Sequence, residues 1–237
     1  MDTLLTAGAS HFGLTLSEAQ LHAFENYYRE LAAWNENINL TRIIEPDDVA
    51  IKHFLDSLSI VPALPQRNKP LSIIDVGSGA GFPGIPLRIA IPEVKVTLLE
   101  STAKKTNFLQ HVVNTLELES VRVITARAEE AGQQPEHRER YDVAVARAVS
   151  RLSVLAEYML PLVKVGGYVI AQKGQNPAEE IEAARSALRI LGGQLIKVQP
   201  VAVPGLDGER HLVIIKKTKP TPKLYPRQPG LPNKESL

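Results

Sequence analysis

The first 70 residues carry apolar positions at helical spacing. Ser17 and Gln20 have the spacing of a capping box, in which two side chains satisfy free backbone groups at the start of a helix. A stripe of apolar residues three or four positions apart follows, at Leu21, Phe24, Tyr28, Leu31 and Trp34. This spacing predicts one buried helix face.

A second helix is predicted to begin at Pro46, because proline favours the first turn of a helix. Its expected buried stripe is Ile51, Phe54, Leu55 and Leu58. His53 and Asp56 lie three positions apart on the opposite side, either as functional side chains or as a surface pair that stabilises the helix. A proline-rich linker ends this segment, so residues 1–70 are expected to form a helical N-terminal cap.

From residue 71 the hydrophobic pattern changes to short apolar runs separated by helical stretches. The runs lie at residues 71–75, 94–100, 121–125, 141–146 and 168–172, and the helical stretches near 84–91, 103–117, 151–163 and 177–191. Near-continuous apolar runs with helical spacers indicate a parallel sheet covered on both faces. Two more runs, at residues 194–203 and 211–216, predict an antiparallel pair. We therefore expect an α/β domain over residues 71–217, with a seven-stranded, mostly parallel sheet.

The composition excludes several kinds of chemistry. The chain has 237 residues, is 44% hydrophobic and 22% charged, and contains no cysteine. Disulfides, thiolate zinc sites, cysteine-bound iron–sulfur clusters and cysteine nucleophiles are therefore absent, and no metal is expected. With no apolar run long enough to span a membrane and no secretory signal, a cytoplasmic protein is expected.

Positive charge is concentrated at the C-terminal end. Residues 216–237 hold six basic residues and one acidic residue, whereas the rest of the chain holds 21 basic and 25 acidic residues. The basic, proline-rich tail at 218–237 can contact phosphates, and Lys223 and Arg227 are the candidate RNA-binding residues. The alternative is a solvated, disordered tail.

A glycine-rich loop follows the first apolar run. Asp75 precedes glycines at 77, 79 and 81, and such loops bind ligands at the carboxyl ends of strands. Residues 79–84 formally match a dinucleotide fingerprint, but the alternating glycines after Asp75 resemble motif I of class I S-adenosylmethionine-dependent methyltransferases. From their positions, Asp75 is expected near the methionine ammonium, or as a cap of the loop, and Glu100 at the ribose.

The segment after the fourth run limits the reaction. Residues 145–151 lack the Asn/Asp-Pro-Pro-aromatic motif of adenine amino-group methylation, and no cysteine is available for carbon-5 methylation of cytosine. Guanine N7 fits what remains, because its lone pair carries no proton to remove. Such an enzyme needs alignment rather than acid–base groups.

Motifs along nearly the whole chain resemble the RsmG (GidB) family of bacterial methyltransferases, which modify guanine N7 in 16S ribosomal RNA. They lie at residues 34–35, 39–41, 53–58, 75–84, 127–130, 146–148, 173–174, 225–227 and 230. One departure is Ser236, where the family usually has a proline before the last leucine.

The resemblance implies a class I methyltransferase (Rossmann-like) fold, S-adenosylmethionine as cofactor, and 16S rRNA or the small ribosomal subunit as partner, with guanine 527 as the target. It implies that Gly77 and Phe82 lie against the cofactor, that Ala128 and Glu129 border the adenine, and that Arg147 lies between cofactor and substrate. Gly79 is expected to bind the cofactor from its place in the same glycine loop. The base-orienting candidates are Asn39, His53, Asp56, Arg147 and Lys173. No membrane or DNA partner is expected, and the oligomeric state stays open.

Several of these residues could have a purely structural role instead. Asn39 could be only a turn residue, Arg147 a structural ion pair and Lys173 a solvated lysine at a strand end. For the whole chain, the alternatives are a nicotinamide-dependent oxidoreductase and a non-enzymatic RNA-binding module with a degenerate cofactor loop.

Overall fold

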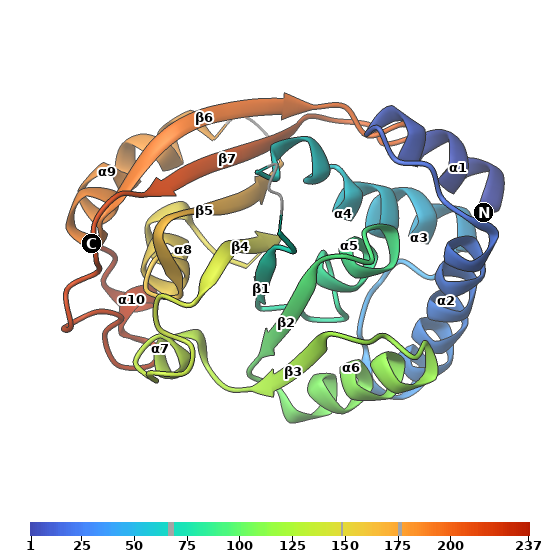
Figure 1. Ribbon diagram of the computed structural model, residues 1–237, viewed down its shortest axis with the longest axis horizontal. Helices are drawn as coiled ribbons and strands as arrows, with labels where there is room; N and C mark the ends of the chain where they lie inside the picture. The colour runs from blue at the N-terminus through green and yellow to red at the C-terminus, as the bar shows by residue number, and fades with distance from the viewer. Residues whose placement is uncertain (66–68, 148, 175–176) are drawn as a thin grey trace.

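The computed structural model describes residues 1–65, 69–147, 149–174 and 177–237 (Figure 1). Residues 66–68 of the predicted linker, Ala148 of the motif at 146–148, and residues 175–176 lie outside the described residues. A seven-stranded sheet forms the centre: β1 (Ser72–Val76), β2 (Lys95–Glu100), β3 (Val121–Thr125), β4 (Tyr141–Arg147), β5 (Val163–Lys173), β6 (Gly193–Val201) and β7 (Arg210–Lys217). Its order is β3-β2-β1-β4-β5-β7-β6, and β7 runs in the opposite direction to the other six strands. The prediction of a mostly parallel seven-stranded sheet is confirmed.

Helices cover both faces of this sheet (Figure 1). One side carries α1 (Asp2–His11), α2 (Glu18–Ile38), α3 (Pro46–Val49), a π-helix (Ala50–Leu55), α4 (Asp56–Leu58), the 3₁₀ turn η2 (Val61–Ala63), α5 (Gly84–Ala90) and α6 (Ala103–Thr115). The other side carries α7 (Ala128–Ala131), α8 (Leu152–Met159), α9 (Ala178–Leu191) and α10 (Leu231–Lys234).

Alternate strand residues fill two separate cores. Ile73 and Val145 pack in a core with the cap residue Phe24, whereas Ile74 and Ala144 pack in the opposite core with α8 and α9. Successive side chains of a strand point to opposite faces, so a sheet covered on both sides needs apolar residues at both sets of positions. The cap therefore shares its core with the sheet.

Several element ends differ from the sequence prediction, most clearly the end of α8 and the start of β5. The predicted capping box is confirmed, with mutual bonds between Ser17 and Gln20 at the start of α2. However, α8 ends at Met159, and β5 begins at Val163 rather than at residue 168. Val163 pairs with Tyr141 ahead of a register shift, so the strand continues through two glycines that weaken its apolar pattern.

The helix predicted from Pro46 contains a six-residue π segment at Ala50–Leu55. This segment contacts α1, and α4 behind it contacts α5, so the helix is enclosed by other elements. His53 and Asp56 are 8% and 5% exposed. The alternative that these two residues form a surface pair is therefore wrong, because both side chains are buried.

The C-terminal tail is docked on the protein. The Arg138 guanidinium donates to the carbonyl oxygens of Thr221 and Tyr225, each at 2.8 Å. The Arg227 guanidinium forms an ion pair of 2.7 Å with Glu157, which is 1% exposed. These bonds fix the tail on α8 and its surroundings, so the alternative of a disordered tail is wrong.

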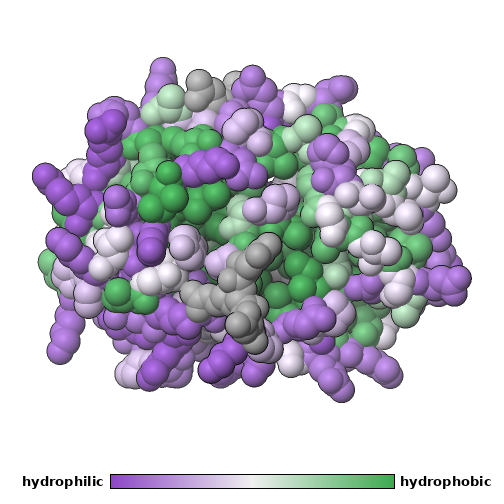
Figure 2. All heavy atoms as spheres, turned by 45° about the horizontal axis from the view of Figure 1, so that its top comes forward, coloured by the Kyte–Doolittle hydropathy of each residue, from purple (hydrophilic) through white to green (hydrophobic). Residues whose placement is uncertain are grey.

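The outer surface carries most of the charged residues. On the face that Figure 2 shows, hydrophilic side chains dominate the rim and hydrophobic atoms lie between them. Among the residues that the structure describes, no helix has the length and apolar character needed to cross a membrane.

Candidate active site

The sheet reverses its strand order between β1 and β4. Here β1 is flanked by β2 on one side and by β4 on the other. Open α/β sheets bind ligands in the crevice outside the carboxyl ends of the strands at such a switch point. The glycine loop after Val76 and Arg147 at the end of β4 both lie at this crevice.

The glycine loop is held open by the end of β2. Gly77 and Gly79 have φ values of +74° and +59°, a region that side chains with a Cβ rarely adopt. The Gly77 amide donates to the Leu99 carbonyl at 2.8 Å, and the Gly79 amide donates to Glu100 Oε2 at 3.0 Å. Glu100 therefore shapes the loop, and its expected contact with a ribose stays a prediction.

Asp75 lies fully buried beneath this loop. Its Oδ2 accepts a bond of 2.9 Å from the Gly84 amide at the start of α5, whereas its Oδ1 has no partner among the described residues. Burial raises the pKa of this carboxyl to about 7, against the lowering effects of the Gly84 amide and Arg147. Asp75 thus caps the loop as the alternative proposed, and it also keeps one acceptor for a cationic ligand group.

A cavity of about 120 Å³ opens beside the loop. Its lining is Val76, Gly77, Leu99, Ser101, Ala126, Arg127, Ala128, Glu129, Val149 and Tyr158. Three residues expected at the cofactor, Gly77, Ala128 and Glu129, therefore meet here. Ligand pockets commonly measure roughly 300–1,000 Å³, so this cavity fits one end of a cofactor rather than all of it.

The residues present fit S-adenosylmethionine. The cavity offers carboxylate and apolar contacts for a nucleoside, and the unpartnered Oδ1 of Asp75 suits the methionine ammonium. Sequence reasoning missed Tyr158 of α8, which lines the same cavity. A partly buried aromatic residue on an apolar helix gives no signal in the sequence that separates it from the core.

Phe82 connects the loop to the cap. Its ring stacks on His53 with centroids 4.6 Å apart, and the Arg147 guanidinium carbon lies 4.9 Å from its centroid. The Tyr27 hydroxyl donates to the Ala80 carbonyl at 2.5 Å, which ties the glycine loop to α2. The cap thus forms one wall of the crevice, and the expected contact of Phe82 with the cofactor stays a prediction.

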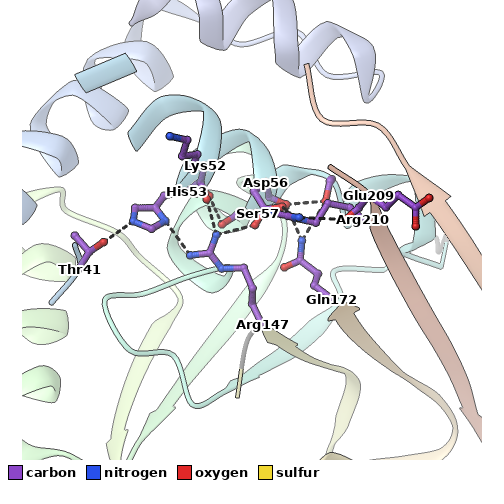
Figure 3. A network of polar contacts seen from close by, with 10 residues as sticks. Thr41, Lys52, His53, Asp56, Ser57, Arg147, Gln172, Glu209 and Arg210 are labelled. Atoms are coloured by element: carbon purple, nitrogen blue, oxygen red, sulfur yellow. Dashed lines mark hydrogen bonds and ion pairs between the residues drawn. The ribbon is translucent and has the colours of Figure 1, made fainter. Parts of the chain in front are cut away.

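Arg147 is the centre of a polar network (Figure 3). Its Nη1 donates to Asp56 Oδ2 at 2.9 Å and to the Lys52 carbonyl at 3.0 Å. The other Asp56 oxygen, Oδ1, accepts from Arg210 Nε at 3.1 Å. Both oxygens of Asp56 are therefore engaged by arginines, which compensates the burial of the carboxylate.

His53 is neutral and has a fixed tautomer. Burial, with help from the Arg147 charge, lowers the pKa of His53 to about 4. Its Nδ1 lies 3.2 Å from Arg147 Nη2, which can only donate, so Nδ1 accepts. The proton of the neutral ring is then on Nε2, which lies 2.8 Å from Thr41 Oγ1.

A second cavity, of about 400 Å³, adjoins this network. It is lined by Lys52, His53, Asp56, Arg147, Gln172, Lys173, Gly174 and Arg210. Four of the five base-orienting candidates therefore meet in one place. The fifth, Asn39, is the exposed left-handed residue that ends α2, which is the turn role proposed as its alternative.

Lys173 and Arg147 are both engaged by protein groups. Lys173 Nζ donates to the Ser150 carbonyl at 2.7 Å and pairs with Glu180 at 2.6 Å, so the solvated alternative for Lys173 is wrong. Arg147 does form the structural ion pair proposed as its alternative, and it also lines the second cavity.

Sequence reasoning did not assign the other four residues of this cavity, Lys52, Gln172, Gly174 and Arg210, to the site. Gln172 had a signal, because it ends a strand beside the predicted Lys173. Arg210 had none, since only the antiparallel position of β7 beside β5 brings it to Asp56, 154 positions away.

The two RNA-binding candidates of the tail differ in exposure. Lys223 is exposed, whereas the Arg227 guanidinium contacts Glu157 at 2.7 Å and the Glu235 carbonyl at 2.7 Å. The Glu129 carboxylate of the first cavity accepts from the Gly230 amide at 2.8 Å, so the tail also reaches the edge of that cavity.

Fold and site together define a class I S-adenosylmethionine-dependent methyltransferase. Similar solved structures support the fold. The precorrin-6y C5,15-methyltransferase of Geobacter metallireducens has a TM-score of 0.51 and 13% identity, covering 69% of this chain and 88% of its own. The fibrillarin of Aeropyrum pernix, solved with bound S-adenosylmethionine, has a TM-score of 0.51 and 15% identity, covering 66% of this chain and 72% of its own.

The family is shown at the level of sequence. The profile described as GidB, rRNA small subunit methyltransferase G, matches residues 20–213. Ribosomal RNA small subunit methyltransferase G of Acetivibrio thermocellus is 48% identical, over 99% of this chain and 96% of its own. The protein of the same name from Bacillus cytotoxicus is 50% identical, over 94% of this chain and 92% of its own. The chain belongs to the GidB family of small-subunit rRNA methyltransferases.

Proposed function

We propose that this chain transfers a methyl group from S-adenosylmethionine to N7 of a guanine in 16S rRNA, guanine 527 by the family resemblance, and that it does so without a general base. The observation that carries the proposal is the pair of adjoining sites at the switch point of a GidB-family chain. One site presents the glycine loop and the unpartnered Asp75 Oδ1. The other is a cation-lined cavity of about 400 Å³.

S-adenosylmethionine, when bound, supplies a methyl group on a positively charged sulfonium. Asp75 would hold the ammonium of the cofactor, and the glycine loop would lie against the cofactor. Ala128 and Glu129 would border the adenine. The unpartnered acceptor under the loop supports a working cofactor site over the alternative of a degenerate one. The family also favours a methyltransferase over a nicotinamide-dependent oxidoreductase.

The residues at the second cavity suit alignment. Guanine N7 has a lone pair and no proton, so the chain needs to orient the base rather than deprotonate it. His53 fits this role because its pKa of about 4 leaves it neutral and unable to titrate near pH 7. Arg147 donates to Asp56, Lys52 and His53, so it has protein acceptors and need not block the N7 lone pair.

Positive charge near this cavity supports an RNA substrate. Lys52, Lys173, Arg147 and Arg210 line it, and these four cations pair with three carboxylates, those of Asp48, Asp56 and Glu180, which leaves a net charge of +1. Cationic side chains bind the phosphates of RNA and release counterions. We infer that the partner is 16S rRNA or the small ribosomal subunit in the cytoplasm, with Lys223 as an added phosphate contact.

Methylation of defined RNA tests the proposal. The purified chain is incubated with S-adenosylmethionine and unmodified 16S rRNA or small subunits, and the product is mapped by mass spectrometry of RNA fragments. We expect one methyl group on N7 of one guanine, and the same modification should be missing from cells that lack the gene. A methyl group on another atom, or none on any form of the RNA, would contradict the proposal.

A further inference from the structure

Gln172 carries a buried amide oxygen that no described residue satisfies. The side chain is 5% exposed and lies at the end of β5, in register with Arg147 of β4. Its Nε2 donates to the Asp56 carbonyl at 2.7 Å and to Ser59 Oγ at 3.1 Å. Its Oε1 has no hydrogen-bond partner among the described residues.

The orientation of this amide is set by its neighbours. The Asp56 carbonyl oxygen can only accept, so the amide atom that faces it must be the nitrogen. A flipped amide would place two oxygens in contact. Figure 3 shows the nitrogen turned to Asp56 and the oxygen turned away, on the side of Arg147. The acceptor is therefore fixed in place before any ligand arrives.

The cavity beside this acceptor has two kinds of recognition group. Lys52 and Arg210 pair with Asp48 and Asp56 but stay 40% and 28% exposed, so they suit a phosphate. Gln172 Oε1 suits an N–H donor. At about 400 Å³ it lies within the range of small-ligand pockets. His53 at its edge is already stacked on Phe82, so the aromatic surface is rigid.

A guanine nucleotide matches these groups. Its Watson–Crick edge presents two donors, N1–H and the 2-amino group, whereas adenine presents an acceptor at N1. Enzymes that modify a base inside structured RNA move it out of the stack and contact its Watson–Crick edge. N7 lies on a different edge of the purine, so an acceptor at N1 or the 2-amino group leaves N7 free.

We propose that this cavity takes the target nucleotide and that Gln172 Oε1 accepts a hydrogen bond from the N1–H or 2-amino group, which selects guanine over adenine. The inference rests on the proposed function and names the residue that sets its base specificity. Gln172 is a specificity-determining residue and exchanges no proton with the substrate.

Base analogues at the target position test this contact. Three RNAs carry guanosine, inosine (which lacks the 2-amino group) or 2-aminopurine (which lacks N1–H and O6), and single-turnover rates are measured over a range of RNA concentrations. With the wild-type protein we expect a loss of about tenfold in rate over apparent KM on one analogue, because one buried acceptor is left unpaired. Equal rates on all three purines would overturn the proposal without any variant.

Gln172→Met removes the acceptor with little change in volume. We expect this variant to lose about tenfold on guanosine RNA and to lose the discrimination against the analogue by the same factor. If the variant still discriminates against the analogue by the full wild-type factor, the effects of the variant and of the analogue are independent, and this result would overturn the proposal.

Ser59→Ala is the matched control, because it removes the second bond of Nε2 and leaves Oε1 untouched. This variant should keep the wild-type ratios of rate over apparent KM between the three RNAs. If Ser59→Ala loses these ratios, they depend on the bonds that hold the Gln172 side chain in place and not on Oε1. Urea unfolding and calorimetric binding of S-adenosylmethionine check that each variant is folded and binds cofactor. If the wild type fails to methylate N7 of guanosine RNA, the proposed function fails; if it methylates all three RNAs equally, only the role of Gln172 fails.

Discussion

Replacing Asp75 with asparagine should remove a specific part of the pH dependence of stability. The carboxyl is fully buried and has a pKa of about 7, against an ordinary value of 3.8. A carboxyl whose pKa is higher in the folded state stabilises the fold when protonated, and this stabilisation is lost as pH rises through 7. Wild-type protein without cofactor should therefore lose stability between pH 6 and pH 8 through this one group.

The magnitude follows from the two pKa values. At pH 6 the folded carboxyl is about ten times more protonated than ionised, whereas the unfolded one is ionised at both pH values. The linked loss between pH 6 and pH 8 is about 1.4 kcal/mol. Asp75→Asn has no such group. From pH 6 to pH 8, the unfolding free energy of the wild type should therefore fall by about that amount relative to the variant.

Urea denaturation at pH 6, 7 and 8 measures this difference. The amide of the variant leaves one buried donor without a partner, but that cost does not change with pH and cancels between the three conditions. Stability curves that stay parallel from pH 6 to pH 8 would refute the raised pKa.

Cofactor binding gives a second measurement on the same variant. An ammonium group prefers the ionised carboxylate, so wild-type affinity for S-adenosylmethionine relative to Asp75→Asn should rise by about tenfold from pH 6 to pH 8. Comparison at each pH cancels the titration of the ligand itself. Equal affinity of the two proteins at pH 8 would show that Asp75 does not contact the ammonium.

Four further outcomes are expected. Gly79→Val should abolish S-adenosylmethionine binding in calorimetry, whereas Gly13→Val, at a comparable positive φ with open space around it, should bind normally. Arg227→Ala should lower the unfolding free energy by about 3 kcal/mol, because Glu157 is left buried without its cation; a loss under 1 kcal/mol would contradict this. Lys223→Ala should leave stability unchanged and reduce the salt slope of RNA binding by about 0.7, and an unchanged slope would exclude that contact. Single-turnover methylation at saturating RNA and cofactor should be flat from about pH 6.5 to 8.5, with His53→Gln more active than His53→Ala; a tenfold rise per pH unit, lost in both variants, would identify His53 as a general base.

The sheet could be predicted because its signals are local. Strands buried on both faces need apolar residues at successive positions. Ile73 and Ile74 are such a pair, and each is buried in the core on its own face of the sheet. The glycine loop is equally local, since its conformation depends on glycines at fixed positions. Helix and strand ends were less predictable where glycines interrupt β5.

The polar network could be predicted only in part. His53, Asp56 and Arg147 were found through family motifs, but the bonds between them depend on long-range packing. Arg210 arrives through a strand that enters the sheet between β5 and β6, and no short-range pattern encodes that position. Arg227 was assigned to RNA from its charge, whereas the buried Glu157 that holds its guanidinium lies 70 positions away.

The π-helix at Ala50–Leu55 makes the length of this segment a constraint in its own right. A π turn closes its bonds over one residue more than an α turn does, so the segment holds an extra residue compared with regular α-helix. Because the extra residue is taken up inside this segment, α4 keeps the orientation that places Asp56 against Arg147 and Arg210. One further inserted residue that the segment does not take up would rotate everything after it by about 100°. Asp56 would then turn away from both arginines while every side chain of the network was still present in the sequence. A single-residue insertion here should therefore remove the contacts of Asp56, whereas a single-residue deletion that restores a regular α turn should keep them.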